Sequence, residues 1–333
     1  GRWMDRGIGA AMLITGSTSL PSNWKTFLRV DSNKDRLFKF LAKAIEQYVP
    51  PAGKLIISTM GDQVVASPQQ AQQQLENLTS SHEEADTRLL LHAKHAISSG
   101  LKRVIIDATD SDVVVIAIAA SCVMSGKIWI AFGHGTKRRY IPCHELSETF
   151  GSEASLGLLL LHAFSGCDTV SALHGIGKKA VWKLWRSMPE MKSIFASLSQ
   201  PLAAIPDEAF ASIQRFTVLL YQRTSQHTDV NTARMKMFSS GKRKIENIPP
   251  TENALLQHAK RAVLQSGHVW SQALVQFPRL PSPSEWGWRS NSDGEWSPLW
   301  TTLDEASKAC QELVNCGCKK LCQANSRCSC RKV

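Results

Sequence analysis

Acidic residues are the chemical groups that stand out in the middle of this chain, because they lie at the ends of apolar segments. Glu84 and Asp86 open one helix pattern, Asp110 and Asp112 follow an apolar strand pattern, and Asp168 follows a second apolar helix pattern. In open α/β sheets, functional sites form beyond the carboxyl ends of strands, where such ends can meet. We therefore expect these five carboxylates to share one small volume.

Five carboxylates in a small volume would need cations to stay ionised together. Hard oxygen ligands favour Mg²⁺ or Mn²⁺. Two such ions, about 3.5–4 Å apart, are a standard arrangement for phosphodiester hydrolysis, in which one activates the attacking water and the other stabilises the leaving oxygen. The five acids are therefore candidate catalytic and Mg²⁺- or Mn²⁺-binding residues: Glu84, Asp86, Asp110, Asp112 and Asp168.

Most of these acids also have a purely structural interpretation. Ser81 and Glu84 fit a capping box at a helix start. Asp86 suits the positive end of the same helix, and Asp110 suits the N-cap of the next one. Asp107 is expected inside the preceding strand, so we leave it out of the site.

The segments that must position the acids alternate between helix and strand patterns. We expect a helix over residues 81–100 and buried strands over residues 102–109 and 127–132. Residues 113–120 fit either element, and we favour a helix because strand–turn–helix order suits a parallel sheet. This order predicts an α/β fold with a mainly parallel sheet flanked by helices, followed by a helical region.

A turn rich in glycine and lysine follows the last acid. Gly175 and Gly177 would let the backbone approach a phosphate closely, amides at the next helix N-terminus can bind it, and Lys178 and Lys179 add positive charge. Such contacts are independent of base sequence and weaken with salt. The alternative is an ordinary glycine turn before an amphipathic helix.

The order of these motifs resembles the second half of the flap-endonuclease type of five-prime nuclease, which has a PIN-like fold. The resemblance covers residues 81–185 and rests on residues 84–86, 109–112, 166–168 and 175–180. It implies that the matching acids hold two divalent metal ions, and that the glycine turn belongs to a helix–two-turn–helix element gripping the duplex backbone.

That family has further metal-binding acids upstream of the position of Glu84. Asp31 and Asp62 do not follow suitable strands here, so the first part of the fold is either missing or degenerate. Whether the protein is an enzyme therefore stays open between a metal-dependent nuclease-like protein and a non-catalytic nucleic-acid-binding protein. Further segments resemble a large group of animal proteins related to mobile elements, namely residues 21–24, 82–88, 140–142, 284–288 and 316–320.

Cysteines gather at the end of the chain, where six of the nine lie between Cys310 and Cys330. A segment this short cannot bury its own core and needs metal or disulfides. In a reducing compartment, thiolates at such spacing favour Zn²⁺, with disulfides or free thiols as the alternative. The segment resembles the start of a CXC-type cysteine-rich module. The candidate zinc ligands are Cys316, Cys318, Cys322, Cys328 and Cys330.

The composition of the 333 residues suits a globular protein with a polyanionic partner. Hydrophobic residues make up 43%, and 39 Lys and Arg against 28 Asp and Glu give a net charge of +11. Nucleic acid is the commonest polyanion, and a merely soluble basic protein is the alternative.

No apolar run reaches the ~18 residues of a membrane span, and no signal-peptide pattern opens the chain. We expect an intracellular protein, the nucleus included, without membrane contact.

We predict four regions along the chain. They are a partial N-terminal arm at residues 1–80, a PIN-like core at residues 81–190, a helical extension with a Trp-rich strap at residues 191–309, and a truncated cysteine-rich module at residues 310–333. The chain lacks an initiator Met, so we expect a fragment cut at both ends.

The tryptophans from Trp270 to Trp300 fit packing of the strap or stacking on bases. Cys143, His144 and His134 fit structural roles better than a Cys/His nucleophile.

Overall fold

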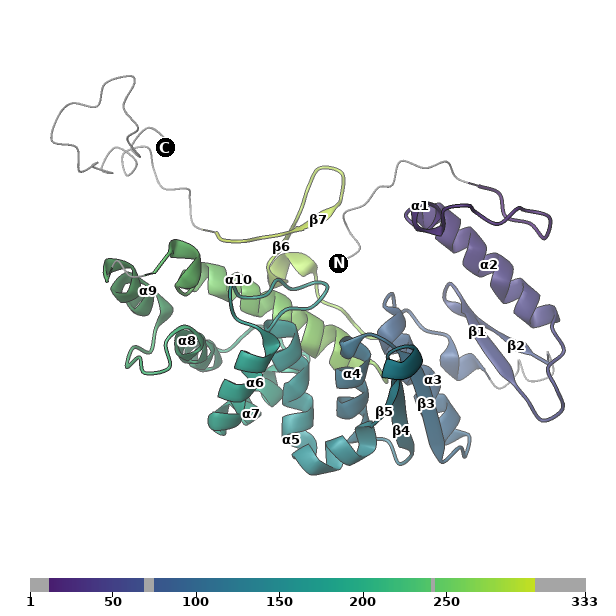
Figure 1. The fold of residues 1–333 in the computed structure, drawn as a ribbon, viewed down its shortest axis with the longest axis horizontal. Helices are drawn as coiled ribbons and strands as arrows, with labels where there is room; N and C mark the ends of the chain where they lie inside the picture. Colours follow the sequence, from purple (N-terminus) through teal and green to yellow (C-terminus); the bar gives the residue numbers. More distant parts are fainter. Residues whose placement is uncertain (1–11, 69–74, 241–242, 303–333) are drawn as a thin grey trace, which may run out of the picture.

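The N-terminal part of the protein is a helix packed on a β-hairpin. The structure, a computed structural model, describes residues 12–68, 75–240 and 243–302. In Figure 1 the N-terminal elements lie at one end of the molecule, and α8 and α9 lie at the other. The N-terminal elements are α1 (Trp24–Phe27), α2 (Asp31–Gln47), β1 (Ile56–Met60) and β2 (Gln63–Ser67). The two strands are antiparallel, as the turn at Asp62 predicts, and α2 packs against both.

A three-stranded sheet forms the centre of the predicted core. Strands β3 (Arg103–Ala108) and β4 (Lys127–Phe132) are parallel, and β5 (Arg139–Pro142) adds to β4 in the antiparallel sense. Helices α3 (Ala85–Ser98), α4 (Ser111–Ser121) and α5 (Cys143–Phe164) pack on these strands. The mixed α/β class is confirmed, with small sheets. The central sheet has one parallel and one antiparallel pairing, so the prediction of a mainly parallel sheet is not confirmed. The finer PIN-like assignment stays a prediction.

The start of α4 is set by a side chain. Asp110 is its N-cap and its Oδ1 accepts a hydrogen bond from the backbone amide of Asp112 at 2.9 Å. The segment after it is helical, as predicted, and it is buried on more than one side, since Val113, Ile116 and Ala117 are buried together with residues 118–120. The N-cap role of Asp110 is therefore confirmed. The capping hydrogen bond uses Oδ1 and does not involve Oδ2.

The start of α3 differs from the expected capping box. The helix begins at Ala85, with Glu84 rather than Ser81 as its N-cap, and the Glu84 side chain makes no capping hydrogen bond. The carboxylate of Glu84 accepts hydrogen bonds from Gln265 and Trp270 instead. The capping-box prediction was wrong because distant donors take the oxygens that the local motif would use.

The rest of the described chain is mainly helical. Gly151, with φ +78° and ψ 165°, breaks α5 into two segments. A π-helix at Leu264–Val269 continues α10, and a small hairpin of β6 and β7 lies beside α10 in Figure 1. The later elements are α6 (Lys178–Ser187), α7 (Glu190–Leu198), α8 (Asp207–Tyr221), α9 (Val230–Ser239), α10 (Glu252–Val263), β6 (Trp288–Ser290) and β7 (Trp296–Pro298).

One hydrophobic core extends across the predicted boundary at residue 190. The ring of Phe164 lies 6.3 Å from that of Phe195 and 6.4 Å from that of Phe216, and all three side chains are fully buried. The later helices thus complete the core that begins around Leu90, while the division into domains stays a prediction. None of the described helices is both long and apolar enough to cross a membrane.

Gly267 is predicted to be indispensable to the close approach of the π-helix to the end of α7. A Cβ at this position would lie 2.7 Å from the carbonyl oxygen of Gln200 and 2.9 Å from that of Leu198. Because the opposing atoms are backbone, Gly267→Ala should lower the free energy of unfolding by roughly 1–3 kcal/mol. Gly16→Ala, where no atom lies within 4 Å, should change it by less than about 0.5 kcal/mol. Urea denaturation measures both, and equal stability of the two variants would refute the packing argument.

Candidate active site

Four chain segments meet beyond the carboxyl end of β3. The N-terminus of α3 brings Glu84 and Asp86, and the N-terminus of α4 brings Asp110 and Asp112. Glu84 interacts electrostatically with Asp86 and Asp112, and Lys178 at the start of α6 interacts with Asp112 and Asp110. The structure therefore links four of the five predicted acids by electrostatic interactions, with Lys178 near Asp110 and Asp112.

Asp112 is buried and has an imidazole partner. Its Oδ1 lies 2.7 Å from Nε2 of His162, in the last turn of α5, and Ser111 Oγ lies 3.5 Å from the same nitrogen. Only 8% of Asp112 is exposed. His162 was missed at the sequence level, although it interrupts the apolar run of residues 158–164. This polar residue inside an apolar helix end was the available signal.

Glu84 lies half-buried against the π-helix. Its Oε1 accepts a hydrogen bond from Gln265 Nε2 at 2.9 Å, and its Oε2 accepts one from Trp270 Nε1 at 3.3 Å. Burial raises the pKa of Glu84, the two hydrogen bonds partly offset this rise, and the charges of Asp86 and Asp112 add to it. A raised pKa in such a cluster is typical of functional carboxylates.

Asp168 lies in a tight turn beside this group. Two backbone hydrogen bonds between Cys167 and Val170, at 2.9 and 3.3 Å, close the turn, and Asp168 is exposed within it. Thr169 Oγ1 donates to Gln265 Oε1 at 2.8 Å, and Gln265 in turn contacts Glu84. The structure thus connects the turn of Asp168 to Glu84 through Thr169 and Gln265, while Asp168 itself is exposed and makes no described contact with the other acids.

Lys178 is the cation within the acidic group. Its Nζ donates to the carbonyl oxygen of His162 at 3.1 Å, to Ser165 Oγ at 3.3 Å and to the carbonyl oxygen of Gly166. Burial lowers the pKa of Lys178, and the nearby Asp112, Cys167 and Asp110 oppose this shift. The ammonium predicted to bind phosphate is thus bonded to the C-terminal end of α5.

The other members of the glycine turn are exposed. Gly175 has φ +71°, a conformation that favours glycine, and Gly177 is the N-cap of α6. A Cβ on Gly177 would have no atom within 4 Å, so a ligand has free access to the backbone there. Lys179 is exposed on the first turn of α6.

The donors are chemically suited to a divalent cation, but they are engaged with protein partners. Carboxylate oxygens with one imidazole suit Mn²⁺ or Mg²⁺. Asp112 is bonded to His162, and Glu84 is bonded to Gln265 and Trp270. Across residues 12–68, 75–240 and 243–302, no three His, Cys, Asp or Glu side chains form a group that could hold a metal ion. The Mg²⁺ or Mn²⁺ site therefore stays a prediction.

The predicted zinc ligands Cys316, Cys318, Cys322, Cys328 and Cys330 lie outside the described residues. Among the described residues, His144 Nδ1 lies 3.0 Å from the carbonyl oxygen of Ile128, and burial raises the pKa of Cys143 to about 12. Both features fit the structural interpretation of this Cys/His pair.

The tryptophans of the Trp-rich segment differ in how far they are exposed. Trp270 and Trp286 are buried, as the packing interpretation predicts. Trp300 is 57% exposed and leaves the stacking interpretation open at that position.

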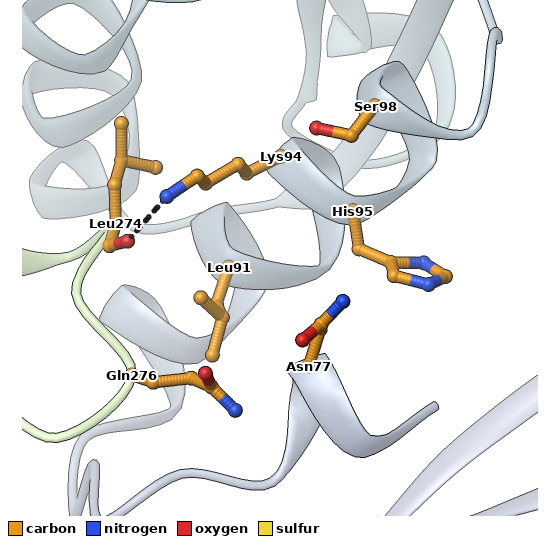
Figure 2. Close-up of a pocket in the computed structure, with 7 residues that line it drawn as sticks. All are labelled: Asn77, Leu91, Lys94, His95, Ser98, Leu274 and Gln276. Atoms are coloured by element: carbon orange, nitrogen blue, oxygen red, sulfur yellow. Dashed lines mark hydrogen bonds between the residues drawn. The ribbon is translucent and has the colours of Figure 1, made fainter. Parts of the chain in front are cut away.

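A cavity of about 290 Å³ lies near the C-terminal half of α3, away from the acids. Figure 2 shows that Lys94 reaches across it, where Nζ donates to the carbonyl oxygen of Leu274 at 2.9 Å. The cavity is lined by Asn77, Leu91, Lys94, His95, Ser98, Leu274 and Gln276. Its lining carries none of the predicted site residues.

A comparison of the chain with family models, curated proteins and solved structures finds no match. The interpretation of the site therefore rests on its own geometry and chemistry. The resemblance to five-prime nucleases stays a prediction.

The bond between His162 and Asp112 is predicted to stabilise the fold. His162→Leu leaves a buried carboxylate without its partner and should lower the free energy of unfolding by about 3 kcal/mol. The double variant His162→Leu/Asp112→Leu should lose less than the sum of the two single variants, because no unpaired charge remains. Urea denaturation of the three variants measures this coupling.

The matched control for this cycle is Glu145→Ala. It removes a 3.7 Å contact with His144 in which the carboxylate side chain is 61% exposed, so stability should change by less than about 0.5 kcal/mol. Additive losses in the double variant would show that the 2.7 Å contact contributes nothing.

Proposed function

We propose that the acidic group belongs to a divalent-metal-dependent phosphodiesterase of the nuclease type, acting on DNA or RNA. The observation that carries the proposal is the gathering of Glu84, Asp86, Asp110 and Asp112 beyond the carboxyl end of a parallel strand. Like charges at that density are stable only with cations nearby. The net charge of +11 supports a polyanionic substrate.

The four carboxylates, with Asp168 in the neighbouring turn, would hold Mg²⁺ or Mn²⁺. When bound, such ions supply an activated water and stabilise the leaving oxygen. The protein's own residues orient the site. His162 fixes the rotamer of Asp112, and Gln265 with Trp270 fixes that of Glu84.

Phosphate binding is assigned to the turn before α6. The exposed N-terminal amides of α6 and the ammonium of Lys179 would contact the strand backbone, with Gly175 and Gly177 allowing close approach. Lys178 would offset charge among the acids and hold the end of α5. Both lysines are exposed, and their proposed functions differ because Lys178 is hydrogen-bonded to the end of α5 while Lys179 would contact phosphate.

Hydrolysis of single-stranded or branched DNA in the presence of Mn²⁺ tests the catalytic proposal. The double variant Asp110→Asn/Asp112→Asn keeps the helix cap and an acceptor for His162 while removing both charges. Its rate should fall by more than about 100-fold, since loss of an outer-shell partner alone costs 10–100-fold.

Asp107→Asn is the control for this assay. Asp107 lies on β3 and forms an exposed 2.8 Å ion pair with Arg138, so its rate should stay near that of the wild type. Hydrolysis that persists unchanged in the Asp110/Asp112 double variant would remove these residues from catalysis.

The second candidate is a non-catalytic nucleic-acid-binding protein. It is favoured by the protein partners that Glu84 and Asp112 already have. In this case Mn²⁺ would not bind at the acids, and nucleic acid would still bind with a strong salt dependence.

Lys179→Gln tests the phosphate contact that both candidates share. The slope of log affinity against log salt should become shallower by about 1. The control is Lys102→Gln. Lys102 is exposed immediately before the first residue of β3, so this variant should leave the slope unchanged. Absence of salt-dependent binding in the wild type would instead favour a protein-interaction scaffold.

We further propose that Cys316, Cys318, Cys322, Cys328 and Cys330 bind Zn²⁺. The support is their spacing and the lack of room for a hydrophobic core in so short a segment. Protein purified under reducing conditions should contain Zn²⁺, and Cys316→Ser/Cys318→Ser/Cys322→Ser should lose it in elemental analysis. Disulfides found by mass spectrometry in place of the metal would contradict the proposal.

A further inference from the structure

A second cavity, of about 300 Å³, adjoins the glycine turn. Its walls come from residues 171–174, the end of α8, α9, α10 and the segment around Ile245. Asn247, two residues further on, has its Oδ1 3.8 Å from the position that a Cβ on Gly175 would take. A strand whose backbone lies on the glycine turn would therefore pass close to this cavity.

Two arginines give the cavity a net positive charge. Arg261 is only 2% exposed, and its Nη1 donates to the carbonyl oxygens of Gly287 at 3.0 Å and Leu299 at 2.7 Å. Arg234 donates to the carbonyl oxygen of Pro249. Within the described part of the chain, neither guanidinium forms an ion pair with a carboxylate.

The lining around these arginines does not balance their charge. Of the described residues that line the cavity, Glu246 alone is acidic. Burial lowers the pKa of Arg261 to about 10, so it stays charged at neutral pH. A buried cation without a carboxylate partner is costly unless an anion joins it.

An aromatic surface lies next to the buried charge. The guanidinium of Arg261 lies 5.2 Å from the centre of the Trp300 ring. Trp300 is 57% exposed, so much of its ring remains accessible to a ligand, and Tyr221 also lines the cavity. A planar ring beside two cations matches a ligand with a flat base and a phosphate.

We propose that this cavity binds one phosphorylated nucleotide, with its phosphate on Arg234 and Arg261 and its base on Trp300. The volume lies at the lower end of the range for ligand sites, about 300–1,000 Å³, so it suits a single nucleotide and not a longer segment. Two sources carry this chemistry, namely the phosphorylated end of a strand and a free nucleoside monophosphate. The first source rests on the proposed action on nucleic acid.

Binding measured in EDTA, where metal-dependent hydrolysis cannot occur, tests the cavity apart from catalysis. Labelled single-stranded oligonucleotides with a 5′ phosphate, a 3′ phosphate or hydroxyls at both ends are compared by fluorescence anisotropy. Adenosine monophosphate is titrated separately against the tryptophan fluorescence. A phosphorylated end should bind at least several-fold more tightly than a hydroxyl end if the strand is the ligand, and the monophosphate should quench the fluorescence if it is the free nucleotide.

Two variants assign the binding to the cavity. Arg234→Gln should weaken the phosphate-dependent binding roughly tenfold, as loss of a charge-assisted hydrogen bond predicts. Trp300→Leu should weaken it by roughly fivefold or more through lost stacking. Arg103→Gln, exposed at the first residue of β3, removes the same charge elsewhere and should have no effect on the preference for a phosphorylated end.

The outcomes separate the cavity from the acidic site. Asp110→Asn/Asp112→Asn should keep the full preference for phosphate, whether or not the wild type hydrolyses DNA. Equal binding of all oligonucleotide ends together with no response to the monophosphate would overturn the proposal, as would wild-type affinity in Trp300→Leu. Trp300 is exposed, so this variant decides the question even if Arg234→Gln fails to fold.

Discussion

Negative charge gathered at the end of one strand is the constraint around which this structure is arranged. Glu84, Asp86, Asp110 and Asp112 come from two helix N-termini whose dipoles favour anions. The dipole acts only within the first turn of each helix. Burial is the main cause of the raised pKa of Glu84, and the charges of Asp86 and Asp112 add to it. Each acid therefore needs a specific partner, and the partners determine which later elements must pack here.

The partners come from elements far along the chain. Asp112 is hydrogen-bonded to His162 in the last turn of α5. The backbone carbonyl of His162 accepts a hydrogen bond from Lys178 at the start of α6. The carboxylate of Glu84 accepts hydrogen bonds from Gln265 and Trp270, which are 181 and 186 residues away in the chain. Gln265 lies in a π-helix, a form that is rare and frequent at functional sites. The wider helix turn is thus the element that brings an amide to the acidic group.

Local chemistry in the sequence predicted the elements that carry the acids. A strand followed by Asp110 as a helix cap depends on neighbouring residues only, and both were predicted correctly. The predicted burial of the strand was wrong, because only Ile106 of β3 is buried and Ile105 is 56% exposed. The capping box at Ser81 failed because Glu84 bonds to Gln265, and no pattern near Glu84 indicates that partner. His162 was visible as a polar interruption of an apolar helix, but its link to Asp112 depends on how α4 packs on α5. Residue types therefore indicated the chemistry, and only packing revealed the partners.

Competition for the carboxylates decides between the two candidate functions. Glu84 must be ionised to hold a divalent ion, and burial, which raises its pKa, opposes that ionisation. Its oxygens would have to leave Gln265 or Trp270, or accept a further ligand beside them. Asp110 and Asp168 are less constrained, because Asp110 uses one oxygen in its cap and Asp168 faces solvent. If the site holds an ion, Asp110 and Asp168 would therefore be the acids most open to it, while Asp112 stays bonded to His162 and Glu84 to Gln265 and Trp270.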